Sequence, residues 1–127
     1  MIHYLDSSFI ISVILRDPRI EDLEKKLSGS LFTSRLGQTE VIRSLNKFSP
    51  ENLGAAHEFL KNLGVIPIDE EILRRVESYS SEVTLKTADA IHMATAEALL
   101  DQGDSLVTLD KQMASNAALM GIAVITS

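Results

Sequence analysis

Four acidic side chains stand where solvated surface residues are not expected. Asp6 and Asp110 each follow directly after a short apolar segment. Asp89 lies among alanines, and Glu40 has only uncharged neighbours. Carboxylates gathered in a dry site raise one another's pKa values, and Mg²⁺ or Mn²⁺, which prefer oxygen ligands, resolve that conflict. Ions held in this way activate water and stabilise displacement at phosphorus, so the four acids predict metal-dependent phosphodiester chemistry.

Each acid also has a purely structural explanation. Asp6 and Asp110 could each cap a helix that begins just after the strand. Asp89 could interact with the dipole at the start of its own helix. Glu40 could form a surface ion pair with Arg43 or another nearby arginine. The chemical interpretation therefore requires a fold that brings the four acids to one place.

Segments of strand and helix character alternate along the chain. Strands are predicted at 2–5, 31–33, 65–68, 105–109 and 122–125, with helical apolar spacing between them. Because parallel strands need crossover connections, this order predicts a three-layer α/β/α fold with a central, mainly parallel sheet. Ligands bind at the carboxyl ends of such strands, where Asp6 and Asp110 lie. Asp89, near its helix start, would then fall beside them.

Three polar residues mark the expected starts of helices. Ser34, Ser49 and Asp69 are each predicted to be an N-cap, and Pro50 follows Ser49 at the position that proline favours. Pro67, inside the third predicted strand, cannot donate to a ladder and predicts an edge position for that strand.

Length and composition limit the class of protein. The 127 residues contain no repeat or linker, so residues 1–127 are predicted to form one domain. The absence of cysteine excludes disulfides, thiolate metal sites and a cysteine nucleophile. The early apolar run at 9–15 is too short for a bilayer and lacks a basic leader. We therefore expect a cytoplasmic protein without a membrane partner.

The net charge of −6 argues against a high-affinity, non-specific binder of nucleic acid. Acids that hold divalent cations are neutralised by them, however, so the charge overstates the repulsion at a metal site. A metal-dependent enzyme that acts on phosphodiesters remains compatible with this charge.

Four stretches of the chain resemble motifs of the PIN-domain family, and within it the VapC-type toxin ribonucleases of toxin–antitoxin pairs. They are Tyr4–Ser8, Thr39–Leu45, Thr87–Ala96 and Val107–Lys111, in the family's order. The third stretch is the most specific, and the resemblance covers essentially the whole chain.

This resemblance implies a PIN-like fold and a metal-dependent endoribonuclease that acts as the toxin of a type II toxin–antitoxin pair. It implies that Asp6, Glu40, Asp89 and Asp110 bind Mg²⁺ or Mn²⁺ and that metal-activated water cleaves RNA. It also implies a homodimer and a cognate antitoxin protein whose C-terminal segment enters the acidic groove.

Supporting roles are expected for four further residues. By the resemblance, Ser8 supports the metal or the first acid, Thr108 occupies a similar polar position beside the last, and Arg43 orients Glu40. His92 lies three residues after Asp89. It is expected to be a packing or supporting residue, because Mg²⁺ does not favour imidazole.

One departure from the family keeps an alternative open. Many relatives carry a further acid shortly after the position of Asp110, where this chain has Lys111, Gln112 and Asn116. A second metal ion would therefore have fewer carboxylate ligands here. A catalytically idle PIN-like module that binds RNA or a protein is therefore the alternative function.

Overall fold

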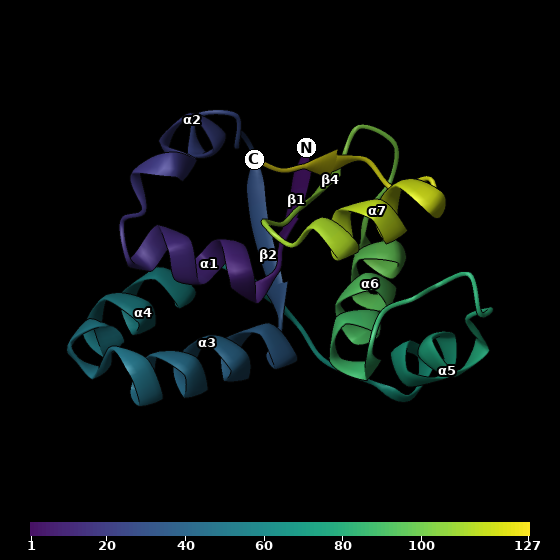
Figure 1. Ribbon diagram of the computed structural model, residues 1–127, viewed down its shortest axis with the longest axis horizontal. Coiled ribbons are helices and arrows are strands. Elements are labelled where there is room, and N and C mark those ends of the chain that lie inside the picture. Colours follow the sequence, from purple (N-terminus) through teal and green to yellow (C-terminus); the bar gives the residue numbers. More distant parts are fainter.

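The computed structural model describes residues 1–127 and contains one sheet of five parallel strands, in the order β3–β2–β1–β4–β5 (Figure 1). The strands are β1 (Ile2–Leu5), β2 (Ser30–Ser34), β3 (Gly64–Ile66), β4 (Ser105–Val107) and β5 (Val124–Ile125). In the central register, Tyr4 of β1 lies opposite Phe32 of β2 and Leu106 of β4. The predicted parallel α/β fold is thus confirmed, with every strand pair parallel.

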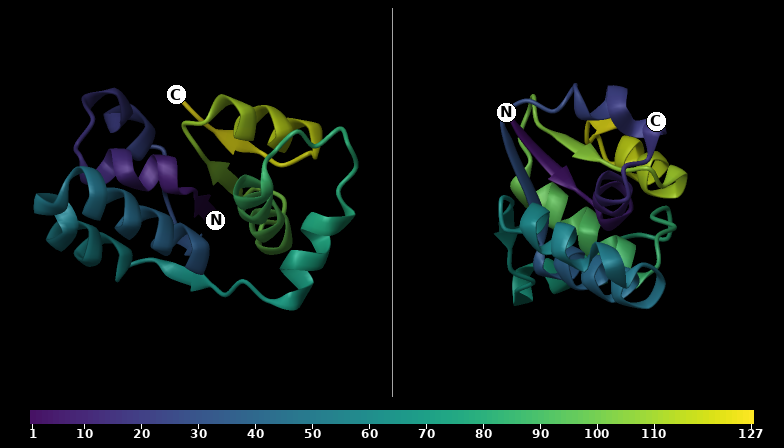
Figure 2. Two further views of the ribbon diagram at one scale, coloured as in Figure 1. Left: turned by 60° about the horizontal axis from the view of Figure 1, so that its bottom comes forward. Right: turned by 90° about the vertical axis from the view of Figure 1, so that its left-hand side faces the viewer.

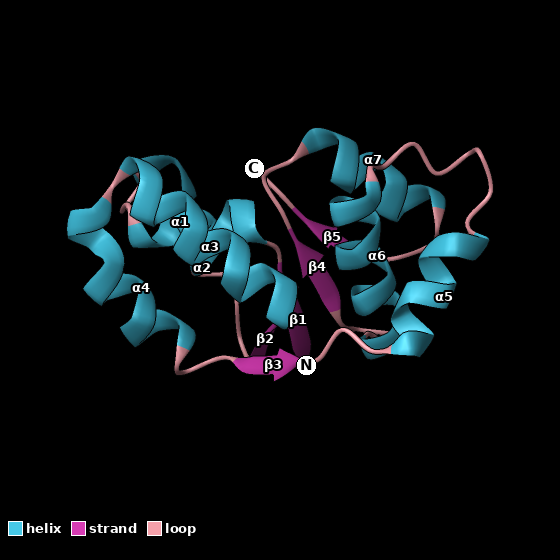
Figure 3. Ribbon diagram, turned by 90° about the horizontal axis from the view of Figure 1, so that it is seen from below, coloured by secondary structure: helices cyan, strands magenta, loops and turns pink.

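Seven α-helices and two short 3₁₀ helices connect the strands. They are α1 (Ser7–Ile14), η1 (Pro18–Ile20), α2 (Glu21–Glu24), α3 (Arg35–Phe48), η2 (Pro50–Asn52), α4 (Leu53–Leu60), α5 (Glu70–Ser78), α6 (Thr87–Leu99) and α7 (Lys111–Leu119). Helices α1–α4 lie on one side of the sheet and α6 and α7 on the other, with α5 packed on α6 (Figure 3). No helix has the length and apolar character needed to cross a membrane.

Two apolar clusters fill the layers on either side of the sheet. Leu5 and Val107 belong to the cluster with α1–α4, whereas Tyr4 and Leu106 belong to the cluster with α6 and α7. Successive strand residues point to opposite faces, so adjacent residues of β1 and β4 serve different layers. Both central strands are therefore buried on both sides and fixed in register.

The sheet reverses its strand order between β1 and β4. The chain proceeds from β1 to β2 and β3 in one direction, and β4 and β5 then extend the sheet on the other side of β1 (Figure 2). In open parallel sheets, the crevice at the carboxyl ends of two such strands is where ligands bind. Asp6 follows β1 and Thr108 follows β4, at this crevice.

Two of the three expected helix caps are confirmed. Ser34 accepts a hydrogen bond from the Gly37 backbone at 3.0 Å, and Asp69 accepts one from Ile72 at 3.0 Å. The third, Ser49, is the N-cap residue before Pro50 as predicted, but its side chain accepts no backbone hydrogen bond. The helix that begins at Pro50 is a 3₁₀ helix, and α4 starts only at Leu53.

The Ser49 hydroxyl forms hydrogen bonds with two side chains instead of with a backbone amide. It donates to Glu51 at 2.9 Å and accepts from the Asn52 side chain at 2.7 Å. Strand β3 lies at the sheet edge as expected, and it ends at Ile66, just before Pro67.

Candidate active site at the carboxyl edge of the sheet

Asp6 is a buried carboxylate held by three donors. It is the N-cap of α1, and its Oδ1 accepts from the Phe9 backbone at 3.1 Å and from the Ser8 hydroxyl at 2.7 Å. The Thr108 hydroxyl donates to Oδ2. Burial, which leaves 3% of the residue exposed, raises the pKa of Asp6, and the hydrogen bonds from Thr108 and Ser8 oppose that rise. Asp6 is therefore a helix cap and a rigidly oriented acid at once.

Ser8 and Thr108 also tie the ends of β1 and β4 together. The Ser8 hydroxyl accepts from the Leu109 backbone at 3.2 Å, and the Thr108 hydroxyl accepts from the Asp110 backbone at 3.0 Å. Each hydroxyl thus donates to Asp6 and accepts from the segment that follows β4. Both side chains lie beside the first and last acids, where the sequence placed them.

Asp110 caps helix α7 but keeps one oxygen free of protein donors. Its Oδ1 accepts from the Met113 backbone at 2.9 Å, and the residue is exposed. The capping explanation is therefore real for Asp110, as for Asp6. A capping carboxylate still has a second oxygen that can bind another group.

Asp89 lies in the first turn of α6, half-buried, and receives no hydrogen bond from the protein. Burial and then the charge of Asp110 raise its pKa, and the charges of Glu40 and Asp6 add to that rise. The charge of His92 opposes this rise, and the other three carboxylates lie close enough to Asp89 to affect it electrostatically. A half-buried carboxylate without a donor, facing three other acids, is the least satisfied group at this edge.

Glu40 is held by a buried histidine rather than by an arginine. His92, 1% exposed, contacts the Glu40 carboxylate through Nε2, and its Nδ1 lies 2.7 Å from the Tyr4 hydroxyl. Burial raises the pKa of Glu40, but the hydrogen bond and charge of His92 outweigh it, so that the pKa lies below its usual value. His92 thus links β1, α3 and α6 through one ring.

Arg43 does not have the expected contact. It forms neither a hydrogen bond nor an ion pair with Glu40, and it lines an outward-facing pocket between α3 and α4. Tyr4, which fixes His92 from the side opposite Glu40, was not expected from the sequence. The available signal was a hydroxyl-bearing residue in an apolar strand, two positions before Asp6.

The donor chemistry of this edge fits a hard divalent cation. Asp6, Glu40, Asp89 and Asp110 offer only carboxylate oxygens, the ligands that Mg²⁺ and Mn²⁺ prefer, and burial together with the charge of Asp110 raises the pKa of Asp89. In the arrangement seen here, no three His, Asp or Glu side chains lie close enough together to coordinate one ion directly. Bound waters, which Mg²⁺ usually retains, would complete such a site.

The chain belongs to the PIN-domain family, whose model matches residues 3–119. Within that family its relatives are VapC-type toxin ribonucleases. It is 32% identical over 124 residues to Ribonuclease VapC46 of Mycobacterium tuberculosis, covering 96% of this chain and 95% of that protein.

Solved structures of toxin–antitoxin complexes share the fold. The DNA-bound VapBC of Salmonella typhimurium matches with a TM-score of 0.76 and 19% identity, over 99% of this chain and 98% of the other. A toxin–antitoxin complex from Klebsiella pneumoniae matches with a TM-score of 0.73 and 21% identity, over 88% and 90%. The PIN-like fold predicted from the four motifs is therefore confirmed.

Proposed function

We propose that this chain is a Mg²⁺- or Mn²⁺-dependent endoribonuclease and the toxin of a type II toxin–antitoxin pair. The observation that carries the proposal is Asp89, a half-buried carboxylate with no protein donor, whose pKa is raised by burial and by the neighbouring acids. Such a group is stabilised when a cation shares the site. The relationship to VapC ribonucleases supports RNA as the substrate.

In this proposal Asp6, Glu40, Asp89 and Asp110 would hold the metal ion, which would supply activated water and charge stabilisation at phosphorus. The other residues keep the acids in place. Ser8 and Thr108 fix the Asp6 carboxylate, and His92 fixes that of Glu40. Preoriented ligands need not reorganise when the cation and the substrate arrive.

The proposed partners are RNA, a cognate antitoxin protein and a second copy of this chain in a homodimer. The toxin–antitoxin complexes among the matched structures support the antitoxin. We infer that residues 1–127 act as a single domain in the cytoplasm. The apolar clusters on the two faces of one sheet support the single domain.

The decisive experiment compares Asp89→Asn with Asp22→Asn, an equal change of charge at a side chain 95% exposed on α2. Purified wild-type protein should cleave RNA in Mn²⁺ and lose that activity with a chelator. Asp89→Asn should fold, yet neither cleave RNA nor inhibit growth, whereas Asp22→Asn should behave as wild type.

Two results would contradict the proposal in different ways. Full cleavage by Asp89→Asn would show that Asp89 is not part of the active site. Wild-type protein that neither binds Mn²⁺ nor shows chelator-sensitive cleavage would instead identify a catalytically idle PIN-like module, the alternative that the missing acid after Asp110 favours.

A further inference from the structure

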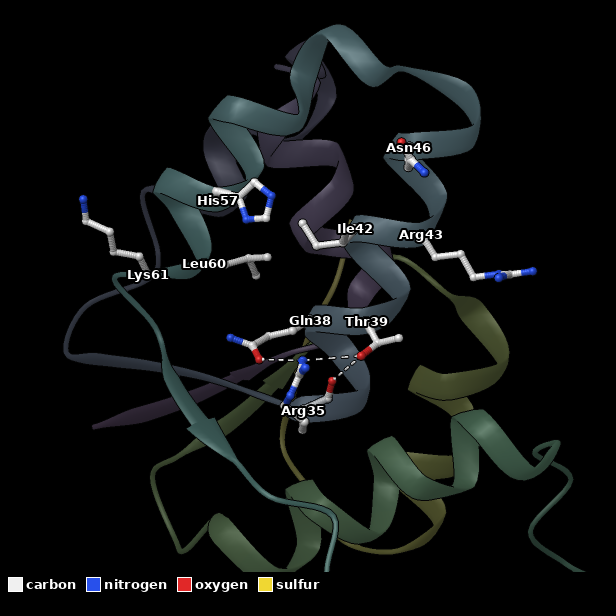
Figure 4. Close-up of a pocket in the computed structure, with 9 residues that line it drawn as sticks. All are labelled: Arg35, Gln38, Thr39, Ile42, Arg43, Asn46, His57, Leu60 and Lys61. Carbon is white, nitrogen blue, oxygen red and sulfur yellow. Dashed lines mark hydrogen bonds between the residues drawn. The ribbon is translucent and has the colours of Figure 1, made fainter.

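A pocket lies outside the acidic edge, between α3 and α4. It has a volume of about 720 Å³, and nine residues from these two helices and the residue that ends α4 line it (Figure 4). This volume is in the range of sites that hold one small organic ligand, which is roughly 300–1,000 Å³.

The pocket is cationic in an acidic protein. Arg35, Arg43 and Lys61 line it and no acidic residue does, although the chain carries a net charge of −6. The Arg35 guanidinium donates only to neutral acceptors, Gln38 at 3.1 Å and Thr39 at 3.4 Å, which orient it without neutralising it. These two bonds are visible in Figure 4. The pocket therefore presents available positive charge.

The other two cations lie at the rim of the pocket, and their charged ends point away from the gap between α3 and α4 (Figure 4). Arg43 takes part in no ion pair. Lys61 pairs with Glu58 at 3.2 Å, but both side chains are about two-thirds exposed, at 67% and 69%. Exposed pairs of this kind contribute roughly 0–1 kcal/mol, so a phosphate can displace Glu58.

The remaining lining matches a nucleotide better than a simple anion. Ile42 and Leu60 point toward each other across the gap between the helices and form an apolar floor (Figure 4). His57 offers a ring for stacking, and Gln38 and Asn46 offer amide groups. Unpaired RNA bases are recognised by stacking and by hydrogen bonds to their edges, while arginine binds phosphate through paired N–H groups.

Arg43 connects this pocket to the proposed active site. It lines the pocket and also a neighbouring depression that contains Glu40, Ser7 and Lys47. Residues three apart on a helix are surface neighbours, so Glu40 and Arg43 lie about 5–6 Å apart at Cβ. A strand that passes over Arg43 would reach both sites.

We propose that the α3–α4 pocket binds one nucleotide of single-stranded RNA, adjacent to the phosphodiester at the acidic edge, and so selects where the strand is cut. This inference rests on the proposed function, which supplies RNA as the strand that is cut. An acidic protein segment would use the cations but not the apolar floor and the amides together.

The test uses Arg35→Gln/Lys61→Gln in an Asp89→Asn background, so that RNA is bound without being cleaved. Binding of a labelled single-stranded oligoribonucleotide is followed by fluorescence anisotropy between 50 and 200 mM salt. We expect Kd to rise about tenfold at low salt, and the slope of log K against log salt to fall by about 1.4, from two contacts at about 0.7 each.

The matched control is Lys25→Gln/Arg74→Gln in the same background. It removes the same charge from side chains 77% and 74% exposed on other elements. The pocket inference is overturned if the two double variants bind RNA alike. It is also overturned if the pocket variant loses affinity for a poly-glutamate peptide but not for RNA.

Cleavage by proteins that retain Asp89 separates this inference from the proposed function. If the wild type cleaves RNA and Arg35→Gln/Lys61→Gln cleaves it with an unchanged KM, the pocket inference fails and the nuclease remains. If the wild type does not cleave RNA, yet RNA binding still depends on Arg35 and Lys61, the pocket is supported and the nuclease activity is contradicted.

Discussion

His92 is held at both of its ring nitrogens. Its Nε2 contacts the Glu40 carboxylate, and its Nδ1 lies 2.7 Å from the Tyr4 hydroxyl. Burial raises the pKa of that hydroxyl, which therefore keeps its proton. Tyr4 thus fixes the ring that orients a proposed metal ligand, in the way outer hydrogen bonds orient ligands elsewhere.

We expect His92→Ala to lower the affinity for Mn²⁺ by roughly tenfold to a hundredfold, the usual effect of losing a group that orients a ligand. His92→Gln keeps a donor and should lose less. Calorimetric titration of Mn²⁺ measures both effects. The matched control is His3→Ala, because His3 is equally buried and hydrogen-bonded at both nitrogens, to Ser105 at 2.6 Å and Ser28 at 2.8 Å.

His3 lies at the start of β1, at the opposite end of that strand from Asp6. Its removal should destabilise the fold without changing the affinity for Mn²⁺. Equal losses of Mn²⁺ affinity in the His3 and His92 variants would mean that His92 acts only through packing.

Asp89→Asn should stabilise the protein in the presence of a chelator, and more so at neutral than at acid pH. The raised pKa of Asp89 means that the folded state binds its proton more readily than the unfolded state does. Stability therefore falls as the pH rises from about 3.8 through the raised pKa. Asparagine does not titrate, so the stability of Asp89→Asn does not fall with pH for this reason. Urea unfolding of both proteins from pH 3 to pH 8 measures the difference, and a wild type as stable as the variant at pH 7 would refute it.

At the residue scale, the sequence predicts which side chains form the candidate site better than it predicts which residues contact them. The positions of Asp6 and Asp110 after apolar strands predict an edge site, and the resemblance adds Ser8 and Thr108 beside them. The partner of Glu40 could not be deduced, because Arg43 and Arg35 are near in sequence whereas His92 is 52 residues away. Local spacing favours an arginine as the partner of Glu40, and only the packing of α6 against α3 brings His92 to it.

Helix α3 approaches the sheet closely because of a glycine in its first turn. A Cβ on Gly37 would lie 2.3 Å from the Thr33 hydroxyl and 3.5 Å from Cε1 of His92. Thr33 cannot easily move, since its hydroxyl donates to the Leu5 carbonyl at 2.8 Å. Glu40 lies one turn further along the same side of α3, so the glycine sets how far its carboxylate reaches.

Gly37→Ala should destabilise the protein by roughly 1–3 kcal/mol, the range for overpacking, and should also weaken Mn²⁺ binding. Gly54→Ala on α4 is the matched control, because a Cβ there meets nothing within 4 Å. It should stabilise the protein by roughly 0.5–1 kcal/mol through its better helix propensity. Urea denaturation tests both, and equal signs would show that Gly37 does not control the approach.

Element order was predictable because apolar spacing and caps are local signals, whereas element ends depend on distant partners. The strand expected at 105–109 ends at Val107, since Thr108 and Leu109 turn to bond Asp6 and Ser8. No local pattern near residue 108 encodes that requirement.

At the scale of the whole molecule, the proposed metal would join the end of β1, α3, the start of α6 and the end of β4. Ligands that bind only the folded state stabilise it, by about 2.7 kcal/mol at 100 times Kd. We expect Mn²⁺ at that excess to stabilise the wild type by this amount, and a chelator to reverse the effect. Asp89→Asn should show much less stabilisation in the same urea titration, and equal stabilisation of both would place the ion elsewhere.

The bond from Thr108 to Asp6 spans 102 residues, and its timing during synthesis follows from that span. Asp6 leaves the ribosome 102 residues before the hydroxyl that orients it, and the strand β4 that pairs with β1 also emerges long after β1. Contacts of such high sequence separation form late in folding. A nascent chain thus carries Asp6 long before that carboxylate can be oriented, and the machinery that translates the chain meets no assembled acidic site until β4 and Thr108 have emerged.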